Sequence, residues 1–336
     1  MPGPRPSRRR VLVAGATTAA LLLASPAALT GCIAPAQAPE EPDPLEAPAR
    51  RAEADAILAV AVAQAHPVLA EAARALAADR AAHATTLRAE LHRAQPRSAP
   101  SSAVPAALPP PAPSPPANPD LASAREALTQ AVRAARDEAA RLVMTLPAYR
   151  AALLASVAAC CATHAVRDHP DMETYRGNRT RTDPDMSPCR GRCPVLVEAL
   201  QGALGAEHAA VWVYGVAGAF VAEALKARLE EAAAAHRARR NATERALIDA
   251  GVRPAPAEPG YLAPEPVTDT ASALRLVITA ETDAAAAWRS VVERSPADSD
   301  LRGAALDALT EAAIKATRWR ATAGTTPLTV PFPGAP

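Results

Sequence analysis

The sequence has few aromatic residues and almost no lysine. Only 9 of its 336 residues are Trp, Tyr or Phe, and Lys226 and Lys315 are the two lysines among 36 basic residues. The 35 acidic residues leave a formal net charge of +1, which argues against a protein built to bind nucleic acid. The sequence also has no Gly-rich nucleotide-binding loop, no strand-borne nucleophile motif and no His-Glu-x-x-His motif. The enzyme classes that those motifs define are therefore excluded.

Alanine is what the sequence has in abundance. It supplies 90 residues within a hydrophobic content of 49%. Alanine is the strongest helix former and a small core residue, so the composition predicts closely packed helices. A chain of 336 residues has room for about two ordinary domains.

The N-terminal segment "PSRRRVLVAGATTAALLLASPAALTGC" has the pattern of an export signal, with basic residues before an apolar stretch. Arg8 and Arg9 resemble the twin-arginine export motif. Leu29 to Cys32 resemble the lipobox of bacterial lipoproteins, which implies cleavage after residue 31 and lipid attachment to Cys32. The alternative is an uncleaved membrane anchor with an incidental cysteine. Both alternatives place the body of the protein outside the cytoplasm, and we expect a lipoprotein on the outer face of the membrane.

Helical periodicity divides the rest of the chain into two similar halves. Residues 32–51 are rich in proline and predict a disordered tether, and residues 323–336 form a C-terminal tail. The predicted helical domains are 52–168 and 194–322, joined by a polar linker at 169–193. Each half has two helices, a long Pro-rich connection and two more helices, the first connection being 96–119 with ten prolines. A single long crossover between the second and third helices is typical of ferritin-like bundles.

Several segments carry a family resemblance. "LVEALQGALGAEHAAVWVYGVAGA", "AAAAHRARRNATERALIDAG", "PVTDTASALRLVITAETDAAAAWR" and "ALDALTEAAIKATRWR" resemble exported ferritin-like domains of unknown function from high-GC bacteria. The segment "HPVLAEAARALAADRAAHATTL" is similar to the leading half that often accompanies that domain. The resemblance implies an all-α protein with two tandem ferritin-like four-helix bundles, the first of them diverged. It implies no established activity.

The ferritin-like class binds two metal ions through glutamates and Glu-x-x-His pairs. In the second half, Glu207, His236 and Glu281 fall at the centres of apolar helical stripes, whereas His208 falls at a stripe edge. Such a set suits one iron or zinc ion. The alternative is a hydrogen-bonded network closed by Arg239 or Arg240, because buried carboxylates need compensation.

The first half keeps less of this pattern. His83 and His164 lie on apolar stripes, but Arg80 and Cys161 stand three residues before them, where the class has glutamate. The third helix of this half has no inward carboxylate. A carboxylate-bridged di-iron site is therefore not expected here.

Four cysteines follow Cys32: Cys160, Cys161, Cys189 and Cys193. An even number in an exported protein favours disulfides, and a bond from Cys161 to Cys189 or Cys193 would tie the linker to the preceding helix. The alternative is a zinc site formed by Cys161, His164, Cys189 and Cys193.

The sequence favours a structural or interaction module over an enzyme. Its expected contact with the membrane is the lipid on Cys32. Small Ala-rich cores also favour pairing, either between the two bundles or in a homodimer. The alternative function is an iron- or zinc-binding ferritin-like metalloprotein of the oxidative or storage type.

Overall fold

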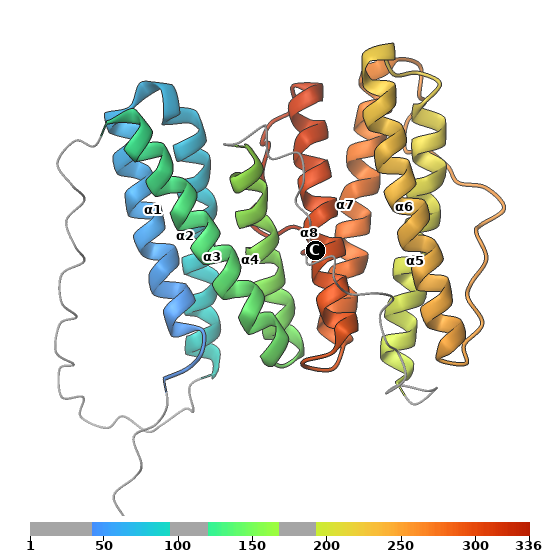
Figure 1. Ribbon diagram of the computed structural model, residues 1–336, viewed down its shortest axis with the longest axis horizontal. Helices are drawn as coiled ribbons and strands as arrows, with labels where there is room; N and C mark the ends of the chain where they lie inside the picture. Colours follow the sequence, from blue (N-terminus) through green and yellow to red (C-terminus); the bar gives the residue numbers. More distant parts are fainter. Residues whose placement is uncertain (1–41, 95–119, 168–192) are drawn as a thin grey trace, which may run out of the picture. The chain divides into compact units, whose positions relative to one another are not determined.

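The computed structural model describes residues 42–94, 120–167 and 193–336, which form helices and no strands (Figure 1). The prediction of an all-α protein is confirmed for these residues. Arg8, Arg9, Cys32, Cys189 and the Pro-rich segment 96–119 lie outside them. The helices are α1 Glu46–Ala65, η1 Pro67–Leu69 (3₁₀), α2 Ala70–Ala94, α3 Leu121–Thr145, α4 Ala148–Arg167, α5 Pro194–Ala217, α6 Glu223–Asp249, α7 Thr270–Arg294 and α8 Asp300–Ala323.

Helix α1 begins before the expected boundary. The prediction of a disordered tether up to residue 51 is wrong for its last six residues, because α1 starts at Glu46. Leu45 and Ala49 are both 0% exposed, so this turn is part of the core. Pro48 is compatible with the first turn because backbone N–H groups there have no partner within the helix.

Short polar residues mark several helix starts. The Asp269 side chain accepts a hydrogen bond from the Ser272 backbone N–H at the start of α7, and Ser272 reciprocates as a capping box. Ser299 caps α8 in the same sense by accepting from the Arg302 backbone N–H. These bonds satisfy donors that the helix itself leaves unpaired.

The helices pack in two sets of four with the same pattern of neighbours. In the first set α1 contacts α2 and α3, and α3 contacts α4; in the second set α5 contacts α6 and α7, and α7 contacts α8. The connection between α6 and α7 runs along α5: it bonds Gln201 near the start of α5, and Thr270 at its end bonds the Phe220 carbonyl beyond the end of α5. Helices α6 and α7 therefore run in the same direction.

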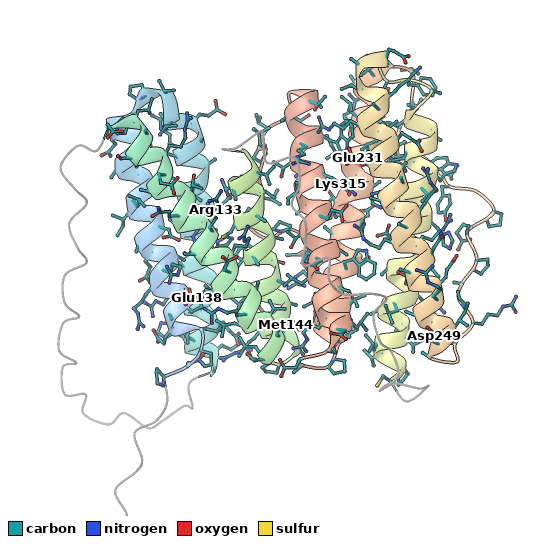
Figure 2. The ribbon with its side chains drawn as sticks, viewed as in Figure 1. Arg133, Glu138, Met144, Glu231, Asp249 and Lys315 are labelled. Carbon is teal, nitrogen blue, oxygen red and sulfur yellow. The ribbon has the colours of Figure 1, made fainter. Side chains whose placement is uncertain are left out.

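Helix α4 lies at the centre of the packing. Every residue from Ala151 to Val166 is buried, because α7 and α8 of the second set cover the faces that α3 leaves open. Its Ala148–Val166 segment is long and apolar enough to span a membrane, but 89% of the window tested is buried within the protein. One apolar cluster continues from α4 into α5, α7 and α8, and side chains fill the space between these helices (Figure 2).

The segment after α8 folds back onto the helices of both sets. His83 of α2 donates to the Pro331 carbonyl at 2.5 Å, and the Ser156 hydroxyl of α4 donates to the Pro333 carbonyl at 2.8 Å. Gly334, with φ of 75°, lies so close to α7 that an added Cβ would be 2.6 Å from the Ala285 carbonyl oxygen. We refer to residues 325–336 as the C-terminal segment.

Candidate functional site

Helices α5, α6 and α7 bring Glu207, His236 and Glu281 together in the second set. All three residues are 0% exposed. His236 lies between the two carboxylates: its Nδ1 is 2.7 Å from Glu207 Oε2, and its Nε2 is 3.1 Å from Glu281 Oε1. We call these residues and the side chains bonded to them the bridged cluster.

Aromatic side chains supply further donors. Trp288 Nε1 donates to Glu207 Oε1 at 2.7 Å, and the Tyr214 hydroxyl donates to Glu281 Oε1. Trp319 Nε1 in turn donates to the Tyr214 oxygen at 2.9 Å. The sequence analysis does not identify these three residues as site residues. The available signal was that a buried Trp or Tyr needs a partner for its polar group.

Charged side chains close the cluster on the α6–α8 side. Arg239 donates to Glu207 Oε1 at 3.3 Å and pairs with Glu311, which lies 2.8 Å from Lys315 Nζ (Figure 2 labels Lys315 on α8). Glu311 is not among the site residues predicted from the sequence, and the long Arg239 side chain reaches it. Arg240, the other arginine considered, bonds Asn241 instead.

The charges of the bridged cluster balance. Burial opposes ionisation of Glu207, but Arg239, His236 and Trp288 outweigh burial and lower its pKa to about 2. Burial likewise opposes a proton on His236, but Glu281 and Glu207 outweigh it and raise the pKa of the imidazole. With His236 protonated, three cations face the carboxylates of Glu207, Glu281 and Glu311, so the buried charge is compensated.

This geometry favours a proton over a metal ion between the carboxylates. A doubly protonated His236 ring donates to both carboxylates, whereas a metal ion on either nitrogen would replace one of these hydrogen bonds. Glu281 Oε2 is the buried side-chain oxygen in the described part of the cluster that has no partner. His208 lies outside the cluster, with Nε2 3.7 Å from Glu244.

A second buried polar cluster joins α1 and α2 in the first set. Arg80 Nη2 is 2.9 Å from Asp55 Oδ2, and Arg80 Nη1 is 3.0 Å from His83 Nδ1. Burial and the Arg80 charge lower the pKa of His83 to about 3. His83 is therefore neutral, accepting at Nδ1 and donating from Nε2 to Pro331.

Asp79 connects α2 to α4 in this half. Its Oδ2 accepts hydrogen bonds from His164 Nε2 at 2.7 Å, from the Thr329 hydroxyl at 2.7 Å and from the Cys160 thiol at 3.6 Å. Sequence reasoning found His164 but missed Asp79. The available signal was spacing, because Asp79 lies four residues before His83 and shares its helical face.

The three described cysteines are free. Cys160 and Cys161 are 0% exposed within α4, and burial raises the pKa of Cys161 to about 11. Cys193 lies at the start of α5, so the predicted bond between Cys161 and Cys193 is not formed. A bond between Cys161 and Cys189 stays a prediction, because Cys189 lies outside the described residues.

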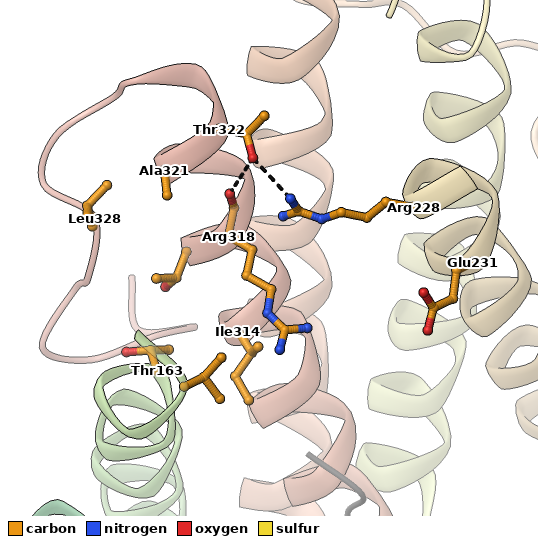
Figure 3. Close-up of a pocket in the computed structure, with 10 residues that line it drawn as sticks. Thr163, Arg228, Glu231, Ile314, Arg318, Ala321, Thr322 and Leu328 are labelled. Atoms are coloured by element: carbon orange, nitrogen blue, oxygen red, sulfur yellow. Dashed lines mark hydrogen bonds between the residues drawn. The ribbon is translucent and has the colours of Figure 1, made fainter. Parts of the chain in front are cut away.

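A cavity of about 510 Å³ lies among α4, α6, α8 and the C-terminal segment (Figure 3). Arg228 and Arg318 line it together with Thr163, Ile314 and Leu328. Arg228 donates to the Thr322 hydroxyl at 3.1 Å and stacks over the Trp319 ring at 4.2 Å. The guanidinium is thus already held by protein groups.

In the described residues, the fold and the two buried polar clusters define an all-helical bundle with a compensated ionic core. Residues 199–336 match a family described as a domain of unknown function, DUF4439, and form a domain of that family. A conserved hypothetical protein from Mycobacterium tuberculosis has a solved structure that is 37% identical, with a TM-score of 0.37; the match covers 38% of this chain and 97% of that one. No curated protein matches this chain.

Proposed function

We propose that this protein is an exported lipoprotein whose α5–α8 set is a ferritin-like bundle serving as a structural or interaction module. The parallel course of α6 and α7 after a long connection supports the ferritin-like topology. The lipobox at Leu29 to Cys32 supports attachment to the outer face of the membrane.

The observation that carries the proposal is the position of His236. Di-iron proteins of the ferritin-like class bind metal ions through carboxylates and histidines. In this protein both imidazole nitrogens of His236 are hydrogen-bonded to carboxylates. Arg239 and Lys315 lie where they compensate the remaining negative charge. The residues present therefore do not fit the di-iron group. The bridged cluster acts as a polar core that fixes how four Ala-rich helices pack.

The alternative is an iron- or zinc-binding protein, and the unpartnered Glu281 Oε2 is the atom that favours it. Nuclear magnetic resonance of ¹⁵N-histidine-labelled protein separates the two. We expect most of His236 to carry protons on both nitrogens at pH 6.5, with the signal assigned by its loss in His236→Gln. A metal-bound, singly protonated ring would contradict the proposal.

Iron chemistry supplies a second readout. We expect the purified chain to oxidise iron(II) no faster than buffer does, and Glu281→Gln to leave bound iron unchanged. Asp283→Asn, an exposed carboxylate on the same helix, is the matched control. Stoichiometric iron that is lost in Glu281→Gln but kept in Asp283→Asn would establish the metalloprotein alternative.

The membrane attachment is tested by fractionation. We expect the wild-type protein in the membrane fraction of the producing cell and Cys32→Ser in the soluble exported fraction, because Cys32 provides the only thiol for the lipid in the lipobox. Equal partition of the two forms would refute lipid anchoring through Cys32.

A further inference from the structure

We infer that Asp79, Cys160 and His164 bind a single Zn²⁺ ion in the first helix set. These residues offer a carboxylate oxygen, a thiol sulfur and an imidazole nitrogen within 4.8 Å of one another. Asp79 is on α2, and Cys160 and His164 are one turn apart on α4. The site is separate from the bridged cluster of α5–α8.

The burial of all three donors indicates a built site. Asp79 is 7%, Cys160 0% and His164 2% exposed. Among the described residues, no arginine or lysine forms an ion pair with Asp79, because the neighbouring Arg80 pairs with Asp55. Three hydrogen bonds to Oδ2 hold Asp79 as a carboxylate, which is the form that a metal ion binds.

The donor types favour zinc. Cysteine, histidine and aspartate are its ordinary protein ligands. Zn²⁺ with the Asp79 carboxylate, the Cys160 thiolate and a neutral His164 has zero net charge, which removes the cost of burying an ion. Binding releases the Cys160 thiol proton to solvent. A neutral His164 frees its Nε2 lone pair by carrying its proton on Nδ1, and a doubly protonated ring releases the Nε2 proton to solvent.

The distances are close to those of a zinc site. Zinc bonds of about 2.0–2.3 Å place tetrahedral ligand atoms roughly 3.3–3.6 Å apart. Cys160 Sγ and Asp79 Oδ2 are already 3.6 Å apart. His164 Nε2 and Asp79 Oδ2, at 2.7 Å, need to separate by less than about 1 Å, which a side-chain rotation can supply.

The C-terminal segment holds the carboxylate in place. Thr329 is 4% exposed, and its hydroxyl donates to Asp79 Oδ2 at 2.7 Å. Such outer partners orient metal ligands, and their loss typically costs 10- to 100-fold in affinity. We therefore expect Thr329→Val to weaken zinc binding at least roughly tenfold.

Metal loading of the purified chain tests the site. The protein is stripped with a chelator, loaded with Zn²⁺ alone and analysed for zinc per chain; Co²⁺ loading then reports a thiolate ligand through its near-ultraviolet charge-transfer absorption. We expect one ion per chain and a cobalt–thiolate band. Cys160→Ser should remove the band and weaken zinc binding at least tenfold, whereas Cys161→Ser, equally buried on the same helix, should keep both.

X-ray absorption of the zinc-loaded wild type gives a readout that needs no variant to fold. We expect one sulfur ligand together with nitrogen and oxygen ligands. A chain that binds no zinc, zinc without a sulfur ligand, or a cobalt–thiolate band that survives in Cys160→Ser would overturn the inference. These outcomes do not involve His236 or Glu281, so they leave the proposed function untouched.

Discussion

At the scale of single residues, the pKa values of two buried histidines shift in opposite directions because of their neighbours. His83 faces the Arg80 guanidinium, and burial acts in the same direction, so its pKa is lowered to about 3. His236 is equally buried but lies between two glutamates, which raise its pKa. The same side chain thus serves as a neutral acceptor in one helix set and as a cation in the other.

These directions predict how stability depends on pH. The folded-state pKa of His83 lies below its ordinary value of 6.5, so the unfolded chain takes up the proton first and the free energy of unfolding falls as pH decreases below 6.5. The slope approaches about 1.4 kcal/mol per pH unit. Glu207, with pKa lowered from 4.5 to about 2, adds to the loss only below pH 4.5. The contribution of His83 is therefore read from the difference between the wild type and a His83 variant in urea unfolding between pH 6.5 and 4.5.

The matched pair for this measurement is His83→Gln and His92→Gln. His92 is exposed on the same helix. We expect the decline between pH 6.5 and 4.5 to flatten in His83→Gln and to persist in His92→Gln. A decline that is equal in both variants would show that another group is responsible. Above pH 6.5, the raised pKa of His236 predicts a separate loss of stability as its proton leaves.

The sequence predicted part of the bridged cluster at this scale. Glu207, His236 and Glu281 were found because a polar residue at the centre of an apolar stripe must point inward. Trp288 and Tyr214 were missed as donors because their rings fit the apolar pattern, which carries no information about their polar atoms. Asp79 shares the helical face of His83, but the apolar pattern alone does not distinguish a buried aspartate from one at the solvent edge of the helix.

At the scale of helices, α4 shows why alanine is so frequent. It is enclosed by α3, α7 and α8, and its buried residues include Ala151, Ala155 and Ala159 at 0% exposure. Small side chains let several helices approach one another closely. The composition is therefore a consequence of packing as well as of helix propensity.

A larger side chain on α4 should be poorly tolerated. We expect Ala155→Leu to lower the free energy of unfolding by about 1–3 kcal/mol, because a closely packed core must move to accommodate three more carbons. Ala81→Leu, at an exposed position of α2, should change it by less than about 0.5 kcal/mol. Urea denaturation of both variants measures the two changes in the free energy of unfolding. Equal changes would mean that the packing around α4 can accommodate a larger side chain.

The helices themselves were predictable from periodicity, since each buries a stripe that repeats every three to four residues. The start of α1 was not. Its prolines read as a tether, yet Pro48 occupies a turn where proline is compatible with a helix. What decides the boundary is the burial of Leu45, which depends on helices distant in the sequence.

At the scale of the whole molecule, the C-terminal segment connects the two helix sets. Gly334 approaches the α7 backbone, and an added Cβ would be 2.6 Å from the Ala285 oxygen. We expect Gly334→Ala to displace the segment and to speed hydrogen exchange of amides around Asp79 and His83. Gly324→Ala is the control: its φ of 65° is equally left-handed, but nothing lies within 4 Å of the added Cβ.

Both substitutions should lower the free energy of unfolding by roughly 1–2 kcal/mol, because alanine is strained in the left-handed conformation. Gly334→Ala should lower it measurably more, because the added Cβ would clash with the Ala285 backbone, which cannot move as easily as a side chain. Equal losses of stability, with exchange unchanged around Asp79, would show that the segment is not held by this contact. This contact could not be predicted from the sequence, because residues 323–336 have no periodicity and the prediction for them is a tail.

The distance along the chain between Asp79 and Thr329 has a consequence for how the protein is made. Their bond spans 250 residues, and that between His83 and Pro331 spans 248. When the first four helices leave the ribosome, the groups that complete their interior have not yet been synthesised. The first helix set therefore cannot complete its native packing before the second is synthesised. Folding of this protein is completed only after translation of residue 333, unlike that of chains whose domains fold one after another during synthesis.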